Sequence, residues 1–276
     1  MVKTDFSKNY SVLIDCPDCY LDVLSIFLRF LNKNWVQREC PVYISTQNKE
    51  IESPKNVYFI KCGENKNSIQ RSVFAMQRIS TKYIITLNSD DFIAGKISNQ
   101  NIERLIDFMA SHDAEYMQIW KLKNKEQRKY RTDLKDIYYR NRKARYSKSL
   151  MANIWNKNRY IDLFSSTNEN GWSIEGLWLK ECLESEQGYD TDYYYCDSDP
   201  LLILHAISKG CWIRKSYRKL RRMGFSKEEL SHRKRLSIRA TIKQNCSMFL
   251  LNHFSSKTFL KFKTISARKN RNTTDY

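Results

Sequence analysis

The stretch Lys82-Tyr-Ile-Ile-Thr-Leu-Asn-Ser-Asp-Asp-Phe92 organises the chain, because an apolar run typical of a β-strand ends there in two adjacent carboxylates. Residues 83–87 predict a buried strand. Open α/β sheets bind ligands just beyond the carboxyl ends of their strands, which is where Asn88, Asp90 and Asp91 emerge. Carboxylates in that position suit a divalent cation that carries substrate phosphates. A turn without a ligand is the alternative, since Asn, Ser and Asp often bond their own backbone.

Strand and helix patterns alternate over the first 120 residues. Short β-type runs occur at residues 10–14, 41–46, 57–61 and 115–122, and helix patterns occur at 18–32, 68–80 and 98–109. This alternation predicts an α/β fold with a largely parallel sheet that helices cover on both faces. The sequence contains neither a Gly-x-Gly-x-x-Gly run nor a Walker loop, which disfavours dinucleotide oxidoreductases and P-loop enzymes.

The second half of the chain has weaker patterns. Residues 123–148 are polar, charged and rich in Tyr without a lasting period, and we expect a mobile insertion there. A helix is expected to begin near Trp172 and Glu175, and Asp199-Pro200 is expected to open a short helix that Gly210 closes. The histidines are too far apart in the sequence for a histidine-based metal site to be expected: His112, His205, His232 and His253.

The composition indicates a folded protein. A hydrophobic content of 41%, with 13% aromatic residues, excludes a mostly disordered chain. No apolar run reaches the roughly 20 residues that span a bilayer, and the best candidate, residues 21–31, contains Arg29. The first eight residues lack the apolar core of a signal peptide, so we expect a cytoplasmic protein. The eight cysteines have no regular spacing and are expected to be reduced and structural.

Positive charge is concentrated at the end of the chain. Residues 209–276 contain 19 Lys and Arg against 3 Asp and Glu, which is +16 of the total +18. Residues 1–208 are therefore nearly neutral, with 29 basic against 27 acidic residues. We expect a catalytic domain over residues 1–208 and a basic, mainly helical C-terminal region over residues 209–276. Such a region indicates a polyanionic partner.

Several segments, taken in order, resemble the bacterial GT-A glycosyltransferases of surface-polysaccharide assembly, of the capsule or O-antigen type. The similar segments are residues 10–21, 68–71, 88–92, 149–155, 172–175 and 210–212. Together they extend over about three-quarters of the chain. The family pattern at the strand end is Asp-x-Asp, and Asn88 stands where the first Asp is usual. The resemblance implies a GT-A-like, Rossmann-type sheet flanked by helices, with the nucleotide half over about residues 1–122 and the acceptor half over about residues 123–208.

The resemblance also implies the residues of an active site. Asp90 and Asp91 are expected to bind Mn²⁺ or Mg²⁺ as ligands on an exposed loop. Glu175 is expected to be the catalytic base, with Trp172 and Trp178 excluding water from its carboxylate. The residues expected to contact the nucleotide-sugar donor are Asp15, Asp18, Tyr20, Arg71, Asn88, Asp90 and Trp172.

The resulting prediction is an inverting transfer of a sugar from a nucleotide donor to a hydroxyl of a lipid-linked glycan. Ile238, Ile242, Cys246 and Phe249 fall on one helical face among basic residues, which is typical of an interfacial helix at the anionic inner face of the cell membrane. A nucleic-acid-binding protein is the first alternative, but it leaves the strand-end acids unexplained, and we expect no nucleic acid partner. A sugar nucleotidyltransferase is the second alternative, and the sequence lacks the glycine-rich basic segment usual near the N-terminus of such enzymes.

Overall fold

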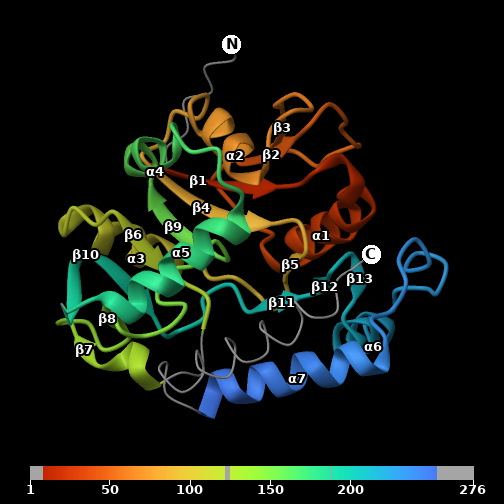
Figure 1. The fold of residues 1–276 in the computed structure, drawn as a ribbon. Helices are drawn as coiled ribbons and strands as arrows, with labels where there is room; N and C mark the ends of the chain where they lie inside the picture. The colour runs from red at the N-terminus through yellow and green to blue at the C-terminus, as the bar shows by residue number, and fades with distance from the viewer. Residues whose placement is uncertain (1–8, 122–124, 187, 254–276) are drawn as a thin grey trace.

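The computed structural model describes residues 9–121, 125–186 and 188–253, and it contains one large sheet with helices on both faces (Figure 1). The order of the strands across this sheet is β3-β2-β1-β4-β9-β6-β10-β8-β7. The strands are β1 (Tyr10–Asp15), β2 (Val42–Thr46), β3 (Val57–Lys61), β4 (Tyr83–Asn88), β6 (Tyr116–Gln118), β7 (Tyr130–Arg131), β8 (Ile137–Asn141), β9 (Asn153–Asn156) and β10 (Tyr189–Cys196).

The directions of the strands confirm the predicted α/β sheet. Strand β1 runs parallel to β2 and β4, β2 runs parallel to β3, and β6 runs parallel to β10. Strand β9 lies antiparallel between β4 and β6, and β8 lies antiparallel between β10 and β7. Within the described sheet, β9 and β8 therefore run against the other seven strands. Asp15 and Asn88 are register partners, so β1 and β4 end side by side.

The helices cover both faces because successive strand residues point to opposite sides. Val12 and Ile14 pack in one core cluster with α1 (Leu21–Asn34) and α3 (Asn99–Ser111). Leu13, between them, packs in the second cluster with residues of α2 (Ser68–Met76), α4 (Lys157–Phe164) and α5 (Gly171–Glu184). The β1 sequence therefore supplies buried side chains to both layers.

The segment expected to be a mobile insertion adds strands to the sheet instead. Residues 125–141 form η2 (Lys125–Arg128), β7 and β8, and Tyr138 and Tyr139 pair with Tyr195 and Tyr194 of β10. The expectation was wrong because the partners of these tyrosines are distant in the sequence, and cross-strand aromatic pairs stabilise a sheet that local periodicity does not reveal. Buried Arg140 also joins the two strands, with its Nη1 atom 2.7 Å from Asp190 Oδ2.

The short helix expected after Asp199-Pro200 is also absent from the described residues, where a turn over residues 199–202 leads into short strands. Strand β11 (Ile203–His205) pairs antiparallel with β5 (Asp91–Ile93), and β12 (Ile207–Ser208) pairs with β13 (Cys211–Trp212). Lys209 and Gly210 make the turn between β12 and β13 with φ angles of +52° and +72°. A short apolar run is compatible with the period of a helix and with that of a strand. The run after Pro200 forms a strand because it pairs with β5.

The basic C-terminal region has two structurally different parts. Five large apolar residues from its first part belong to the main core cluster or are buried beside it: Trp212, Leu220, Phe225, Leu230 and Leu236. Helix α6 (Arg214–Arg222) lies in this part. The second part is α7 (Ile238–His253), a helix whose Ile238, Ile242 and Phe249 are 65%, 58% and 56% exposed. Residues 254–276 of the expected region lie outside the described residues.

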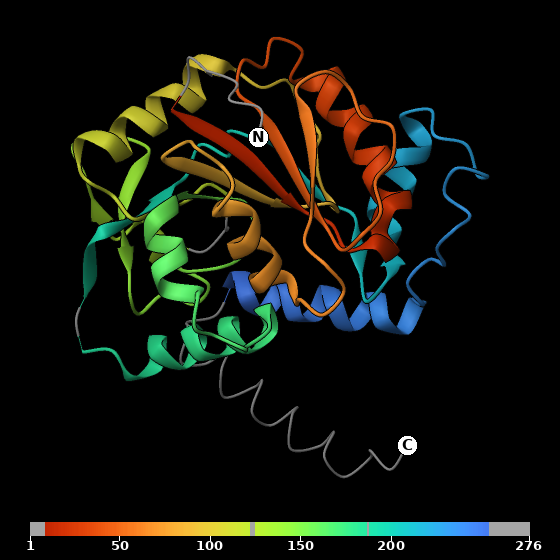
Figure 2. The same cartoon turned by 90° about the horizontal axis from the view of Figure 1, so that it is seen from above.

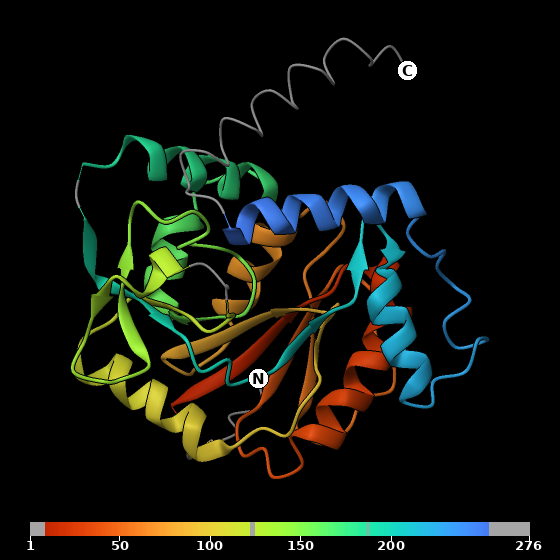
Figure 3. The ribbon, with the colours of Figure 1, turned by 90° about the horizontal axis from the view of Figure 1, so that it is seen from below.

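Helix α7 lies on the outside of the molecule, on the same side as α5. Figures 2 and 3 show both helices along one edge of the molecule. Among the residues that the structure describes, no helix combines the length and the apolar character needed to cross a bilayer.

Candidate active site

A cavity of about 640 Å³ lies at the carboxyl ends of β1 and β4. The first turns of α2 and α5 and the turn between β12 and β13 also contribute to its walls. The position agrees with the rule that ligands of α/β sheets bind beyond the strand ends. Side chains with ionisable or amide groups in the lining are Asp15, Tyr20, Asn67, Arg71, Asn88, Asp90, Tyr146, Tyr160, Asn170, Glu175, His205 and Lys209.

Asp15 and Arg71 form a buried ion pair in this cavity. Arg71 Nε lies 2.8 Å from Asp15 Oδ1, and Arg71 Nη2 lies 2.7 Å from Asp15 Oδ2. Ser45 donates a third hydrogen bond to the same carboxylate at 3.2 Å. The side chains of Arg71 and Asp15 are only 6% and 12% exposed. The capping box formed by Asn67 at the start of α2 fixes the helix that carries Arg71.

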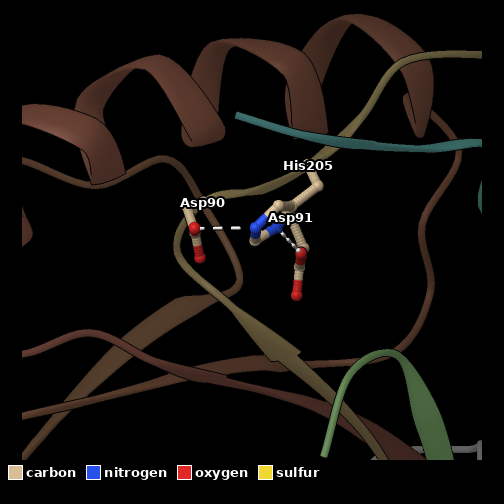
Figure 4. Close-up of side chains that lie close together, drawn as sticks. All are labelled: Asp90, Asp91 and His205. Atoms are coloured by element: carbon tan, nitrogen blue, oxygen red, sulfur yellow. Dashed lines mark hydrogen bonds and ion pairs between the residues drawn. The ribbon is translucent and has the colours of Figure 1, made fainter. Parts of the chain in front are cut away.

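Asp90, Asp91 and His205 form a second charged group at the cavity (Figure 4). His205 Nδ1 lies 3.0 Å from Asp91 Oδ1 and 3.7 Å from Asp90 Oδ2. Asp91 is fully buried, and its Oδ2 accepts hydrogen bonds from the backbone and side-chain N–H groups of Asn88 at 3.2 and 3.1 Å. The expectation that Asp91 is an exposed loop ligand is therefore wrong, because the β5–β11 pairing places it inside the protein.

The charges of this group depend on one another. Burial lowers the pKa of His205, but its hydrogen bond to Asp91 and the two nearby carboxylates outweigh that effect and raise it to about 9. Burial and the neighbouring Asp91 charge raise the pKa of Asp90 to about 7. At neutral pH a protonated imidazole therefore neutralises part of the carboxylate charge.

The donor atoms of this group fit a divalent cation. One ligand atom from each of the three residues lies within 4.8 Å of the other two. Carboxylate oxygens suit Mg²⁺ and Mn²⁺, and the imidazole nitrogen favours a transition metal over Mg²⁺. A bound cation would therefore be held by Asp90 and His205 at the cavity, with Asp91 beside them, and Mn²⁺ fits this mixed set better than Mg²⁺.

Glu175 reaches the cavity from the first turns of α5. Asn170 caps this helix by accepting a hydrogen bond from the Ser173 N–H. The backbone N–H of Leu150 donates to Glu175 Oε1 at 2.9 Å and so orients the carboxylate. Trp172 also lines the cavity, but its side chain is 86% exposed. The expectation that Trp172 excludes water from Glu175 is therefore wrong.

The structure brings most of the expected site residues together. Asp15, Tyr20, Arg71, Asn88, Asp90, Trp172 and Glu175 all line the cavity. Asp18 does not: its carboxylate accepts hydrogen bonds from the backbone N–H groups of Gln47, Asn48 and Lys49, at 3.0 to 3.3 Å. This carboxylate fixes the loop after β2.

Sequence reasoning missed several cavity residues, of which His205 and Lys209 carry charge into the site. His205 enters the site because β11 pairs with β5 in a register that sets it opposite Asp91. The run Ile203-Leu204-His205 gives only a weak local signal, since His205 interrupts an apolar segment that continues in Ala206 and Ile207. Lys209 has no comparable local signal, because its position depends on the turn between β12 and β13.

Comparisons with known proteins give weak likenesses. No family model matches the chain, and no curated protein matches it. Similar solved structures include a cytidylyltransferase from Leptospira borgpetersenii, at 16% identity and a TM-score of 0.44, which covers 90% of this chain and 98% of that one. S. aureus TarS 1-349 gives 14% identity and a TM-score of 0.43, covering 68% of this chain and 60% of that chain. An active-site mutant of LgtC gives 11% identity and a TM-score of 0.37, and the match covers 83% of this chain and 85% of that chain.

At these scores the likenesses carry no argument about activity. The chain also spans only 60% of the TarS 1-349 chain. The functional argument therefore depends on the cavity itself.

Proposed function

We propose that this protein is a glycosyltransferase that moves a sugar from a nucleotide-sugar donor to a hydroxyl of a lipid-linked glycan. The observation that supports it is the composition of one cavity at the ends of β1 and β4. This cavity combines a candidate cation group, at Asp90 and His205, with a carboxylate on a separate helix, Glu175. Transfer of a sugar from a nucleoside-diphosphate sugar needs a positive group beside the phosphates and a base that takes the proton of the acceptor hydroxyl.

The donor would lie across the strand ends. Asp15, Tyr20 and Arg71 line the part of the cavity formed after β1 and at the start of α2, and this part would hold the nucleoside. Asn88 and Asp90 at the end of β4 would lie beside the diphosphate, together with Lys209. Mn²⁺ bound by Asp90 and His205 would supply positive charge to the departing diphosphate.

The chemical step would use Glu175 as a general base. Its carboxylate takes the proton of the acceptor hydroxyl, and the acceptor oxygen forms a bond to the anomeric carbon of the sugar. The bond between that carbon and the diphosphate breaks, and the nucleoside diphosphate leaves with the electron pair. A base that acts on the face of the sugar opposite the leaving group gives inversion. The Leu150 N–H holds the carboxylate in one orientation for this transfer.

The acceptor would be presented at a membrane surface. Helix α7 exposes apolar Ile238, Ile242 and Phe249 beside exposed Arg239 and Lys243. Apolar side chains flanked by cations are typical of helices that lie in the interface of an anionic bilayer. We propose that α7 docks the enzyme on the cytoplasmic membrane face, where a lipid-linked glycan is available.

A thermal-shift panel tests the proposal. UDP, GDP, CDP and their sugars are each added with and without Mn²⁺, and a nucleotide present at 100 times its dissociation constant adds about 2.7 kcal/mol to the free energy of unfolding. We expect one nucleotide family to stabilise the protein, more strongly with Mn²⁺, and its sugar donor to release the nucleoside diphosphate when acceptor is present. Stabilisation by none of them overturns the proposal.

A second assay separates the proposal from a sugar nucleotidyltransferase. That enzyme would join a nucleoside triphosphate to a sugar phosphate and release pyrophosphate. Pyrophosphate release from such a mixture, without release of nucleoside diphosphate from a nucleotide sugar, would replace the proposed activity by the nucleotidyl transfer.

A further inference from the structure

Arg233 is a residue of the basic C-terminal region that binds the segment at the start of α1. It lies between α6 and α7, and its Nε and Nη2 atoms are 2.7 and 2.8 Å from the two carboxylate oxygens of Asp22. Nη2 also donates to the Cys19 carbonyl, and Nη1 donates to the Gly210 carbonyl at 3.4 Å. The side chains of Arg233 and Asp22 are only 11% and 24% exposed. One guanidinium therefore joins the start of α1 to the β12–β13 turn.

The same guanidinium also lies over an aromatic ring of the cavity. The Arg233 Cζ atom is 4.1 Å from the centroid of the Tyr20 ring, a distance typical of a cation–π contact. Tyr20 lines the cavity at the end of η1 (Asp18–Tyr20). Burial and the nearby Asp90 carboxylate raise the pKa of the Tyr20 phenol, which agrees with a position close to the candidate cation group. Arg233 thus supports a ring that lines the cavity.

The backbone around Arg233 is fixed against β13. The Trp212 N–H donates to the Lys234 carbonyl at 2.9 Å, and the Leu236 N–H donates to the Trp212 carbonyl at 2.8 Å. Through Gly210, Arg233 also restrains the turn that carries Lys209 into the cavity. Gly210 supplies one positive φ angle of this two-residue turn at little cost, whereas the +52° φ of Lys209 is unfavourable for a residue with a side chain, and the Arg233 bond to Gly210 helps to hold it.

We propose that Arg233 is a positioning residue for the nucleoside diphosphate, holding Tyr20 and the Lys209 turn at two sides of the cavity. The inference deepens the proposed function and rests on it, because the ligand is the nucleotide part of the proposed donor. Arg233 acts through Tyr20 and Lys209. A planar guanidinium can bind both oxygens of Asp22 and stack on Tyr20 at the same time, which a lysine ammonium cannot do.

The substitution that tests this role is Arg233→Lys, which keeps the charge and removes the planar fork. Its matched control is Arg235→Lys in the same segment, where the guanidinium lies 5.3 Å from the ring of Tyr217, a residue outside the cavity lining. The probes are UDP, GDP and CDP with Mn²⁺, and the readout is the dissociation constant from calorimetry. We expect Arg233→Lys to weaken nucleotide binding by about tenfold, within the range for contacting residues, and Arg235→Lys to change it less than about twofold.

A double-mutant cycle separates positioning from general structural damage. If Arg233 acts through Tyr20, Arg233→Lys should weaken binding less in a Tyr20→Ala background than in the wild type. The inference is overturned, with the proposed function unaffected, if the wild type and Arg233→Lys bind nucleotide equally well. It is also overturned if Arg233→Lys weakens binding by the same factor in the wild type and in the Tyr20→Ala background. Failure of the wild type to bind any of the three nucleotides overturns the proposed function and this inference with it.

Discussion

His205 Nδ1 lies 3.0 Å from Asp91 Oδ1, although 114 positions separate the two residues in the chain. The contact exists because β11 and β5 pair antiparallel with His205 opposite Asp91. Asp91 is fully buried, whereas the side chain of Asp90 keeps 14% of its surface exposed and lines the cavity. The two adjacent carboxylates therefore differ in their surroundings: Asp91 contacts His205 inside the protein, and Asp90 faces the cavity.

Substitution of the two aspartates should give different results. Asp90→Ala removes a proposed Mn²⁺-binding carboxylate that lines the cavity. The substitution should leave the fold intact and abolish the extra stabilisation that Mn²⁺ gives in the presence of nucleotide. Asp91→Ala leaves the partly buried donors of Asn88 and His205 without the Asp91 carboxylate as acceptor, so it should lower the free energy of unfolding by about 1–3 kcal/mol. Urea unfolding of both variants, with and without Mn²⁺ and nucleotide, measures these effects. Equal stability of the Asp91→Ala variant and the wild type would contradict the structural role.

Affinity for Mn²⁺ should rise with pH. Metal binding requires a neutral imidazole and an ionised carboxylate, and the pKa of His205 is raised to about 9 and that of Asp90 to about 7. Between pH 7 and 9 each bound ion should displace one proton from His205, so the affinity should increase by about tenfold per pH unit. Below pH 7 the slope should steepen, because Asp90 must also lose its proton. Mn²⁺ titrations from pH 6.5 to 8.5 measure how the affinity changes with pH. The same pH dependence in the His205→Gln variant would exclude His205 as the group that loses the proton.

Much of the candidate site could be predicted from local sequence. An apolar strand that ends in polar residues located Asn88 and Asp90, an inference that depends on the geometry of a parallel sheet, in which strand ends meet. Asp15 and Arg71, at the same edge, were expected only from the resemblance to GT-A glycosyltransferases. The caps at Asn67 and Asn170 fix α2 and α5 through local hydrogen bonds of the same kind.

The rest depends on contacts between distant segments. His205 joins the site through one strand pairing, and Tyr138 and Tyr139 form part of the sheet only because β10 is their partner. The basic residues of the C-terminal region also have different partners that composition does not reveal. Arg233 binds Asp22, and Arg214 donates to the Leu236 carbonyl, so neither belongs to a simple polyanion-binding surface.

Helix α7 should bind anionic vesicles through its exposed apolar face. Basic residues near a charged bilayer contribute roughly 1 kcal/mol each, so co-sedimentation should be strong with anionic vesicles, weak with neutral ones and lower in high salt. Ile242→Glu adds a negative charge to the apolar face and should reduce vesicle binding at least about tenfold. Val36→Glu is the matched control, since Val36 is 78% exposed and lies outside α7. Equal binding to both vesicle types, or tighter binding to DNA, would contradict membrane docking.

Glu175→Gln should slow sugar transfer without loss of donor binding. The glutamine side chain keeps an oxygen that accepts the hydrogen bond from the Leu150 N–H, so α5 and the cavity should stay in place. It cannot take a proton from the acceptor hydroxyl, and the loss of a general base lowers rates by about 10² to 10⁴. The matched control is Glu184→Gln on the same helix, where the carboxylate is 64% exposed and pairs with Lys180. Single-turnover rates and donor dissociation constants distinguish the roles: weaker donor binding at an unchanged rate would assign Glu175 to the donor, and a normal rate would assign the base to another carboxylate.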